Sequence, residues 1–270
     1  MSIQQSRPGE QDFLSGYKPA DFPPFAVTVD LAVFTIRAGL LAVLLVQRGA
    51  HPYQGYWALP GGFVHADESA GQAARRELAE EAGSDTFTGY LEQLRTYSKP
   101  DRDPRMRVVS VAYVAMAPGL PDPQPGGDAA AARWWPVEDL GPLNAPDADA
   151  DAGPARPGSD ADAPPLAFDH AAILADALDR IRSKLEYTTL ATSFIDEPFT
   201  LADLHRVYAA VWGQAPDLGN FRRKVLGTEG FVVEAERSAE AAAGTSGGRP
   251  PLLYRRGEAT VLHPPMLRPR

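Results

Sequence analysis

The chain has 270 residues, more than one average domain, and this length favours two domains or one domain with appended segments. A hydrophobic fraction of 44%, a charged fraction of 23% and the absence of cysteine argue against wholesale disorder, a membrane protein, a disulfide framework and a thiolate metal site. The net charge of −9 is unevenly distributed along the chain. Residues 201–270 hold ten Lys and Arg against seven Asp and Glu, a net charge of +3, which leaves −12 for residues 1–200. A basic C-terminal part is compatible with a surface that faces nucleic acid.

The N-terminal part predicts a flexible segment followed by a β-hairpin. Residues 1–23 are polar and contain several prolines, and they lack the hydrophobic core of a signal peptide, which together with the absence of cysteine fits a cytoplasmic location. Runs of apolar and β-branched residues at positions 25–36 and 41–47 flank the four residues Arg-Ala-Gly-Leu. Two such runs on either side of a short glycine-containing turn predict antiparallel strands.

A strand, a glycine turn and an acidic helix follow the hairpin. Residues 57–64 predict a short strand entering the glycine turn at residues 61–62, and a helix begins at Glu68 or Ser69 and ends at Gly83. Glycine lets a backbone approach a metal ion or a phosphate closely. This order of elements therefore suits a site for a metal-bound diphosphate.

The predicted helix carries three carboxylates on one face. Glu77, Glu80 and Glu81 are separated by three and four positions, a spacing that brings them together on a helix with 3.6 residues per turn. Like charges at this spacing repel by roughly a few tenths of a kcal/mol per pair, and a divalent cation would reverse the sign of that interaction. Oxygen ligands of this kind suit Mg²⁺ or Mn²⁺. The alternative is an acidic amphipathic helix with no metal.

These residues resemble the Nudix box, the sequence motif of the Nudix hydrolases. The matching positions are Gly62, Glu68, Arg76, Glu77, Leu78, Glu80, Glu81 and Gly83. One position departs, because the box normally ends in an aliphatic residue where this chain has Ser84, and that position concerns helix packing more than ligands.

The resemblance implies an α+β chain whose first domain is a Nudix α/β/α sandwich with a mixed sheet. It implies a divalent metal ion, Mg²⁺ or Mn²⁺, held by the carboxylates Glu77, Glu80 and Glu81 and by the Gly62 carbonyl. It also implies that Arg76 holds the acidic cluster in place, and that Glu77 orients a ligand or acts as a base in the hydrolysis of a diphosphate.

A charged loop at residues 98–105 lies between strands predicted at residues 87–97 and 108–116. Guanidinium groups match the geometry of phosphate oxygens, so the arginines in and after this loop are candidates for binding the phosphates or a ribose of a ligand. These candidates are Arg102, Arg105 and Arg107. A solvated loop is the alternative. The segment PDRDPRMRVVSVAY resembles part of the ADP-ribose-handling branch of the Nudix superfamily, which implies ADP-ribose or a similar nucleotide as ligand.

Composition then separates two domains. Residues 132–140 resemble the final strand and turn of the Nudix fold, which places the Nudix domain at residues 24–143. Residues 144–166 repeat Asp, Ala and Pro with almost nothing apolar to bury, and they predict a disordered or extended linker. The second domain takes up residues 167–270.

The second domain predicts a winged helix-turn-helix module. Its helices are predicted at residues 168–187, 189–194, 201–212 and 217–227, and its strands at residues 231–234 and 252–255. Thr200 is the expected N-cap of the third helix, and a flexible segment at residues 238–250 joins the two strands. A helix, a turn, a second helix and a two-stranded wing are the elements of this DNA-binding module.

The helix at residues 217–227 has polar residues around apolar Phe221 and Val225. Asn side chains read adenine, and Arg side chains read guanine or hold phosphates. The candidates for binding double-stranded DNA are Asn220, Arg222, Arg223 and Lys224. A solvated cationic helix face is the alternative, and it is the commoner fate of such a run.

The segment from Tyr187 through FTLADLHRVYAAVWG to DLGNFRRKVLG resembles the C-terminal domain of Nudix-related transcriptional regulators of NAD metabolism. Because the box and this domain occur in the same order, the resemblance covers most of the chain. It implies a homodimeric regulator that binds DNA and senses ADP-ribose, with or without hydrolysis of ADP-ribose to AMP and ribose 5-phosphate.

Two other interpretations stay open, a dedicated diphosphate hydrolase whose C-terminal domain serves dimerisation, and a protein-interaction scaffold. The intact acidic trio favours hydrolysis. Many Nudix enzymes recruit a further glutamate from a later loop, however, and this chain has none between Glu92 and Glu138. Asp101, Asp103 and Asp128 are the candidates to replace it.

Overall fold

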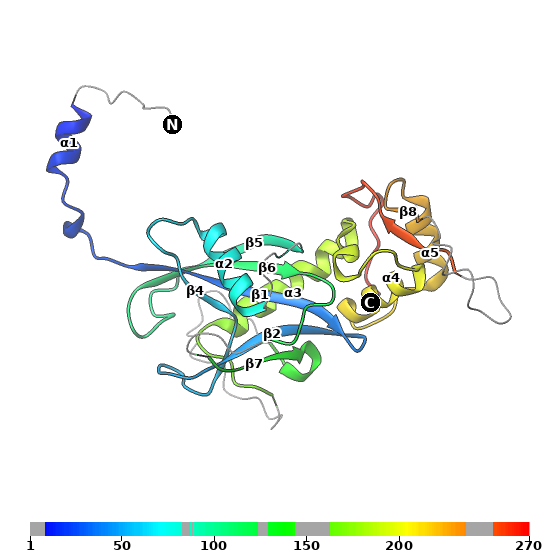
Figure 1. Cartoon of the computed structure of the whole chain (residues 1–270), viewed down its shortest axis with the longest axis horizontal. Helices are drawn as coiled ribbons and strands as arrows, with labels where there is room; N and C mark the ends of the chain where they lie inside the picture. The colour runs from blue at the N-terminus through cyan, green and yellow to red at the C-terminus, as the bar shows by residue number, and fades with distance from the viewer. Residues whose placement is uncertain are drawn as a thin grey trace.

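The computed structural model describes residues 9–82, 87, 89–123, 129–143, 163–235 and 251–269. A domain built on a sheet lies beside a smaller, mainly helical domain that contains the C-terminal part of the chain (Figure 1). The predicted fold class, α+β with a mixed sheet followed by a winged helix, is confirmed. None of the described helices has the length and apolar character needed to cross a membrane.

A mixed sheet forms the centre of the first domain. β1 and β2 make the predicted hairpin, and its turn residues Ala38 and Gly39 have φ angles of 50° and 80°, in the left-handed region. β1 also pairs in parallel with β6, and β6 pairs antiparallel with β5. The strands are β1 (Ala26–Arg37), β2 (Leu40–Arg48), β3 (Trp57–Ala58), β4 (Gly61–Phe63), β5 (Tyr90–Tyr97), β6 (Val108–Met116) and β7 (Ala129–Pro136).

The single strand predicted at residues 57–64 is wrong, because the structure divides this stretch into β3 and β4. Pro60 lies between them and has no N–H to donate to a strand ladder. The Pro60 carbonyl accepts a hydrogen bond from the Leu31 N–H at 2.8 Å. The chain therefore changes its partner here from β2 to β1, and this change places the glycine pair beside β1.

Helices cover both faces of the sheet. Side chains alternate along β1, so Leu31 and Val33 pack in the cluster that contains α2, whereas Ala32 and Phe34 pack in the cluster that contains α3. The α3 helix lies in the segment that the sequence assigned to the second domain, yet it covers the sheet of the first. The helices are α1 (Glu10–Gly16), η1 (Pro19–Asp21), α2 (Ala70–Ala82), η2 (Val137–Leu140), α3 (His170–Tyr187), η3 (Leu190–Phe194), α4 (Leu201–Trp212) and α5 (Leu218–Gly227).

The C-terminal domain has the predicted helices and wing. Thr200 and Asp203 form a capping box at the start of α4, and the Phe221 ring of α5 lies 5.6 Å from the buried Tyr208 ring of α4. β8 (Val232–Glu234) and β9 (Tyr254–Arg256) pair antiparallel, as expected for a wing. The segment predicted to be flexible at residues 238–250 lies outside the described residues.

The two predicted flexible segments are described in part. Residues 9–23 contain α1 and η1, and neither helix has a buried residue. Within the predicted linker, residues 144–162 lie outside the described part of the chain. Its last residues bridge to β3, because the Pro165 carbonyl accepts a hydrogen bond from the Trp57 N–H at 2.8 Å and Leu166 is buried.

Candidate functional site

Arg76 gathers the acidic side chains around α2. Its guanidinium donates to Oε1 of Glu68 at 2.7 Å and to Oε1 of Glu77 at 2.7 Å. It also donates to the Phe63 carbonyl at 3.2 Å, and Oε1 of Glu80 lies 3.6 Å from its Nη1. One arginine therefore joins the end of β4 to the acidic residues before and within the helix.

The acidic residues near Arg76 differ in their pKa values. The hydrogen bond from Arg76 lowers the pKa of Glu68 to about 2. Burial raises the pKa of Glu77, whose side chain is 10% exposed, and the hydrogen bond from Arg76 opposes that change. A cation placed beside Glu77 would favour its charged form.

The Gly62 backbone lies against the Glu77 carboxylate. A Cβ atom placed on Gly62 would lie 2.0 Å from Oε1 of Glu77, so only glycine fits at this position without a shift. Gly62 and the Glu77 carboxylate thus form a close cradle, and carboxylate oxygens suit Mg²⁺ or Mn²⁺.

The other two members of the acidic trio lie further along α2. The Glu80 side chain is 59% exposed, and the side chain of Glu81 is outside the described part of the chain. Among the residues that are described, no three His, Asp or Glu side chains gather closely enough to hold a metal ion by themselves.

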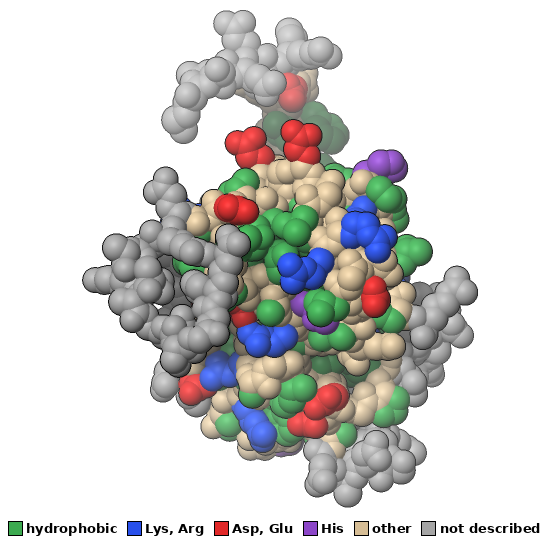
Figure 2. Space-filling view, turned by 90° about the vertical axis from the view of Figure 1, so that its right-hand side faces the viewer, with side chains coloured by type: hydrophobic (Ala, Val, Ile, Leu, Met, Phe, Trp, Pro, Cys, Tyr) green, Lys and Arg blue, Asp and Glu red, His purple; other side chains and the backbone are tan. Residues whose placement is uncertain are grey.

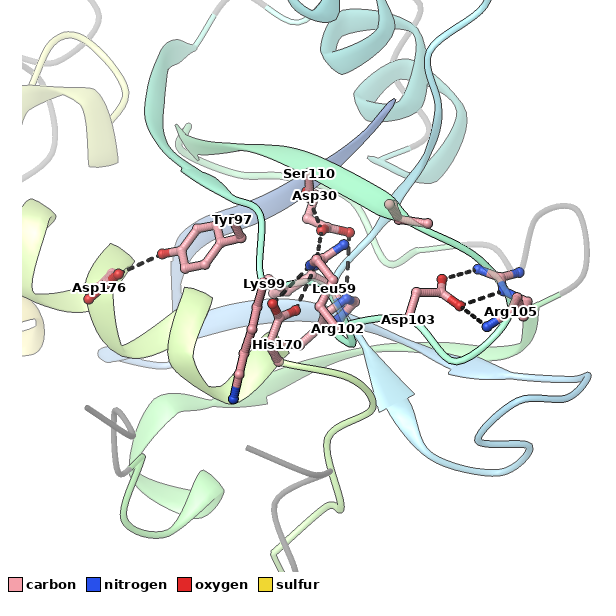
Figure 3. A network of polar contacts seen from close by, with 12 residues as sticks. Asp30, Leu59, Tyr97, Lys99, Arg102, Asp103, Arg105, Ser110, His170 and Asp176 are labelled. Atoms are coloured by element: carbon pink, nitrogen blue, oxygen red, sulfur yellow. Dashed lines mark hydrogen bonds and ion pairs between the residues drawn. The ribbon is translucent and has the colours of Figure 1, made fainter. Parts of the chain in front are cut away.

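A cavity of about 230 Å³ borders the glycine turn. Its walls come from β1, β2, β4, the loop after β5 and the beginning of α3. In Figure 3, Asp30, Arg102 and His170 point toward one another at this position. The residues that matter most for its chemistry are Asp30, Gly62, Phe63, Arg102, Arg105, Phe168 and His170.

Arg102 is buried at the edge of this cavity and shared between two carboxylates. It donates to Asp169 through Nε at 2.9 Å and through Nη2 at 2.6 Å, and Nη2 also donates to Asp30 at 3.1 Å. Ser110 donates a further hydrogen bond to Asp30. Burial alone would lower the pKa of Arg102, but Asp169 and Asp30 outweigh it and raise the pKa. This ion pair network ties the loop after β5 to the beginning of α3.

His170 completes the network from the first turn of α3. Its Nδ1 accepts a hydrogen bond from the Leu59 N–H at 2.8 Å, and its Nε2 lies 3.5 Å from Oδ1 of Asp30. Burial lowers the pKa of His170. A neutral ring that carries its proton on Nε2 satisfies both contacts.

The mouth of the cavity combines arginine and aromatic side chains. The guanidinium of Arg105 lies 5.7 Å from the Phe63 ring and 5.8 Å from the Phe168 ring, and that of Arg48 lies 4.9 Å from the Phe168 ring. Such faces suit planar groups and anions. Asp103 accepts two hydrogen bonds from the Arg105 side chain, at 3.0 and 2.7 Å.

The remaining candidates of this region differ in where they lie. Arg107 donates to the Lys99 carbonyl at 3.0 Å, and it is Arg102 and Arg105 that line the cavity. Asp101 is exposed, and Asp128 is outside the described residues. Asp103, the third candidate to replace the missing glutamate, lines the cavity and is paired with Arg105.

Asp30, Asp169 and His170 were not predicted as site residues from the sequence. A charged residue within the apolar run VTVDLAV was a usable signal for Asp30, because a buried charge needs a partner. Asp169 and His170 follow the predicted linker and carry no local signal that connects them to the Nudix domain.

The DNA-binding candidates lie together on α5. Oδ1 of Asp217 caps this helix by accepting a hydrogen bond from the Asn220 N–H at 2.8 Å. Arg222 and Arg223 are exposed, Arg223 donates to Oδ1 of Asn220 at 2.9 Å, and Lys224 is partly buried. Figure 2 views the molecule from the end that carries this helix, and Lys and Arg side chains are interspersed with hydrophobic ones on that face.

Both domains of the chain are similar to known proteins. A family model for the NUDIX domain matches residues 24–156, and one for the NrtR DNA-binding winged helix domain matches residues 191–256. The chain is 34% identical over 257 residues to the ADPR responsive transcriptional repressor NtrR of Acinetobacter baylyi, with 94% of this chain and 91% of that protein covered.

Solved structures show the same similarity. Shewanella oneidensis NrtR complexed with a 27mer DNA is 32% identical, with a TM-score of 0.63 and coverage of 84% of this chain and 92% of that one. The NUDIX domain of that protein complexed with ADP ribose is 35% identical, with a TM-score of 0.51 and coverage of 64% and 98%.

Proposed function

The chain belongs to the NrtR family, with a Nudix domain followed by an NrtR-type winged helix domain, and we propose that it is a transcriptional repressor that responds to ADP-ribose. The observation that carries this proposal is the position of α3. One end of this helix lies in the cavity beside the Nudix box, and the other end packs against the winged helix. A single rigid element therefore connects a ligand site to a DNA-binding domain.

ADP-ribose would bind with its diphosphate between the cavity and the box. At about 230 Å³ the cavity is smaller than the roughly 300–1,000 Å³ of most ligand pockets, so a nucleotide would extend from it over the glycine turn. Arg102 and Arg105 supply positive charge, and the rings of Phe63 and Phe168 supply flat apolar surface. This combination suits a ligand that contains phosphates, a base and sugars.

The cradle around Gly62 and Glu77 fits a divalent cation. Glu77, Glu80 and Glu81, with the Gly62 carbonyl, would hold Mg²⁺ or Mn²⁺, and Arg76 keeps Glu77 in place. When bound, such an ion neutralises diphosphate charge and lowers the pKa of a water molecule.

We infer that Arg102 transmits the presence of the ligand to α3. A ligand phosphate that attracts Arg102 competes with Asp169, which immediately precedes α3. At the far end, Nε of Arg182 donates to the Val211 carbonyl of α4 at 3.1 Å, and the Trp212 indole N–H donates to the Arg182 carbonyl at 3.1 Å. A shift of α3 would therefore move α4 and, with it, α5.

This route predicts that Asp169→Asn, which weakens the hold on Arg102, changes the ADP-ribose concentration that releases half of the bound DNA. The concentration is measured by fluorescence anisotropy of labelled duplex DNA. If the variant and the natural chain release DNA at the same concentration, the route through Arg102 is wrong, although the repressor proposal would stand.

The repressor proposal is tested with duplex DNA from the regions upstream of the chain's own gene and its neighbours. We expect a retarded band in a mobility shift experiment and its loss when ADP-ribose is added. The matched control is Arg222→Ala with Arg223→Ala, which should abolish the shift yet retain ADP-ribose binding by calorimetry. Failure to shift DNA under any ligand condition would overturn the proposal.

Hydrolysis of ADP-ribose is a second candidate function. The joint hold of Arg76 on Glu68 and Glu77 favours it, since this arrangement serves a metal-dependent reaction and is not needed for sensing alone. The test is release of AMP from ADP-ribose with Mg²⁺ or Mn²⁺, with Glu77→Gln as the inactive comparison. An absence of AMP from the natural chain would exclude the enzyme and leave the repressor unaffected. A chain that released AMP but never bound DNA would instead be a dedicated hydrolase.

A further inference from the structure

Two leucines are exposed on α5, the helix that carries the DNA-binding candidates. Leu218 is 55% exposed and Leu226 is 51% exposed, whereas Phe221 and Val225 of the same helix are buried. A helix that only covers a core carries charged and polar residues on its solvent side. The two leucines are therefore placed where a helix with a purely structural role would carry polar residues.

The two leucines lie on one side of α5 with Arg222 between them. Residues four positions apart lie one above the other on a helix, so Leu218, Arg222 and Leu226 form a stripe. Arg222 is exposed, and in the described part of the chain it has no ion-pair partner. On the opposite side of the helix, Asn220 and Lys224 line a cavity of about 580 Å³ between α5 and the last described residues of the chain. The stripe is thus the side of α5 that the end of the chain leaves free.

We propose that this stripe reads DNA bases, with Leu218 and Leu226 packed against thymine methyl groups and Arg222 donating to a guanine between them. The inference rests on the repressor proposal and adds to it the base types that α5 selects. In the major groove only thymine presents a methyl group, and arginine donates to the two acceptors of guanine. The N-terminal residues of a recognition helix contact base edges, and Leu218 is the first residue of α5.

Charge and size favour DNA over a protein partner for this stripe. The helix contains Arg222, Arg223 and Lys224 and no acidic residue, so its surface attracts phosphates. A stable protein interface takes roughly 800 Å² from each partner, and two half-exposed leucines supply only a small part of that area. A thymine methyl group, in contrast, needs contact with a single apolar side chain.

The spacing of the stripe predicts the spacing of the bases. Leu218 and Leu226 are eight positions apart, which is about 12 Å along a helix axis. Base pairs are about 3.4 Å apart, so the two leucines reach methyl groups about three to four base pairs apart. Gly219 and Gly227 lie next to the leucines and are exposed, and they carry no side chain that would hold the helix away from the bases. We therefore expect two thymines at this separation, on either strand, with a guanine between them.

Replacement of thymine by uracil removes only the methyl group from the DNA and tests this inference directly. The duplex is one from upstream of the chain's own gene or its neighbours, and its dissociation constant is measured by fluorescence anisotropy. Burial of one methyl group changes an equilibrium constant about fourfold. We therefore expect the natural chain to bind the uracil duplex at least about fourfold more weakly than the thymine duplex. Equal binding of the two duplexes would overturn the inference.

The combined change Leu218→Ala and Leu226→Ala assigns the effect to the stripe. Both leucines are exposed and alanine favours helix, so α5 should still fold. We expect this variant to bind the thymine and uracil duplexes equally. The matched control is Leu14→Ala, which changes a 61% exposed leucine of α1 and should keep the full difference between the duplexes. If the double variant still prefers thymine, uracil acts through the shape of the DNA and the inference is wrong.

The salt dependence of binding separates contact with bases from contact with phosphates. The double leucine variant should keep the slope of affinity against salt, because a methyl contact releases no counterions. A changed slope would show that the leucines position α5 on the phosphates and do not read bases. A natural chain that binds neither duplex would overturn the repressor proposal and this inference with it. That result is distinct from equal binding of both duplexes, which leaves the repressor proposal intact.

Discussion

Arginine side chains are held in opposite ways at the two ends of the molecule. Beside the cavity, the Arg102 side chain is 4% exposed and is shared between Asp30 and Asp169. On α5, Arg222 and Arg223 are exposed, and within the described residues neither makes an ion pair. The first kind of arginine is already neutralised, and the second kind is available to a new anion.

The difference separates Arg102, which can respond to a bound ligand, from Arg222 and Arg223, which can contact DNA directly. Removing Arg102 from its place would take the guanidinium away from Asp169 and leave the buried Asp30 with Ser110 and the neutral His170 ring, which is costly. A ligand can therefore engage Arg102 only by replacing part of this pairing, and the replacement affects α3. An exposed arginine on α5 gives up only water and counterions when it meets a phosphate.

The largest expected effect comes from Arg102→Ala. It removes the guanidinium that pairs with the buried Asp30 and the largely buried Asp169, and we expect the free energy of unfolding to fall by about 3–5 kcal/mol in urea denaturation. The matched control is Arg107→Ala on the same loop, which loses hydrogen bonds to backbone carbonyls and should cost about 1 kcal/mol. Equal losses in the two variants would mean that the buried network has no special role in stability.

On the other side of the comparison, Arg222→Ala and Arg223→Ala should leave stability almost unchanged, within about 0.5 kcal/mol. We expect DNA binding to weaken by about 1–3 kcal/mol for each arginine that reads a base, and the slope of affinity against salt to fall by about 1 for each lost phosphate contact. Arg206→Ala on α4 is the control, because this exposed arginine is already paired with Asp203. An unchanged salt slope in the α5 variants would place the DNA contact elsewhere.

The sequence predicts the winged helix well and misses the buried network beside the cavity. The helices α4 and α5 and the Thr200 cap were predictable, because apolar spacing and capping residues act over a few positions. The network around Arg102 was not, since its hydrogen bonds join residues 67 and 72 positions apart. The sequence identified Arg102 as charged and near the ligand, but its buried partners depend on the packing of α3 over the sheet.

The buried network also predicts a dependence of stability on pH through His170. Burial lowers its pKa below the ordinary 6.5, so the unfolded chain takes up a proton before the folded chain does. The stabilising contribution is present above the ordinary pKa of 6.5 and declines as the pH falls through that value. The charged groups that face this ring are Asp30, Arg48, Arg102 and Asp169.

His170→Gln isolates this contribution, because glutamine keeps an acceptor for the Leu59 N–H but does not titrate. Urea denaturation at pH 7.5 and 5.5 should show a smaller loss of stability for the variant than for the natural chain. Identical losses would show that His170 is protonated in the folded protein as readily as in the unfolded one.

The smallest expected effect concerns the N-cap of α4 in the winged helix and sets a scale for the buried ion pairs. Thr200→Ala removes the side chain that accepts the Asp203 N–H at 3.1 Å at the start of α4. Loss of such an N-cap costs about 1 kcal/mol, and Thr200→Ser should restore most of it because serine caps equally well. The free energies of unfolding of both variants are measured in urea, beside Arg102→Ala. If Thr200→Ala lowers the free energy of unfolding as much as Arg102→Ala does, the buried network contributes no more to stability than a single helix cap. The contrast between a buried, paired arginine and exposed ones would then explain DNA binding but not stability.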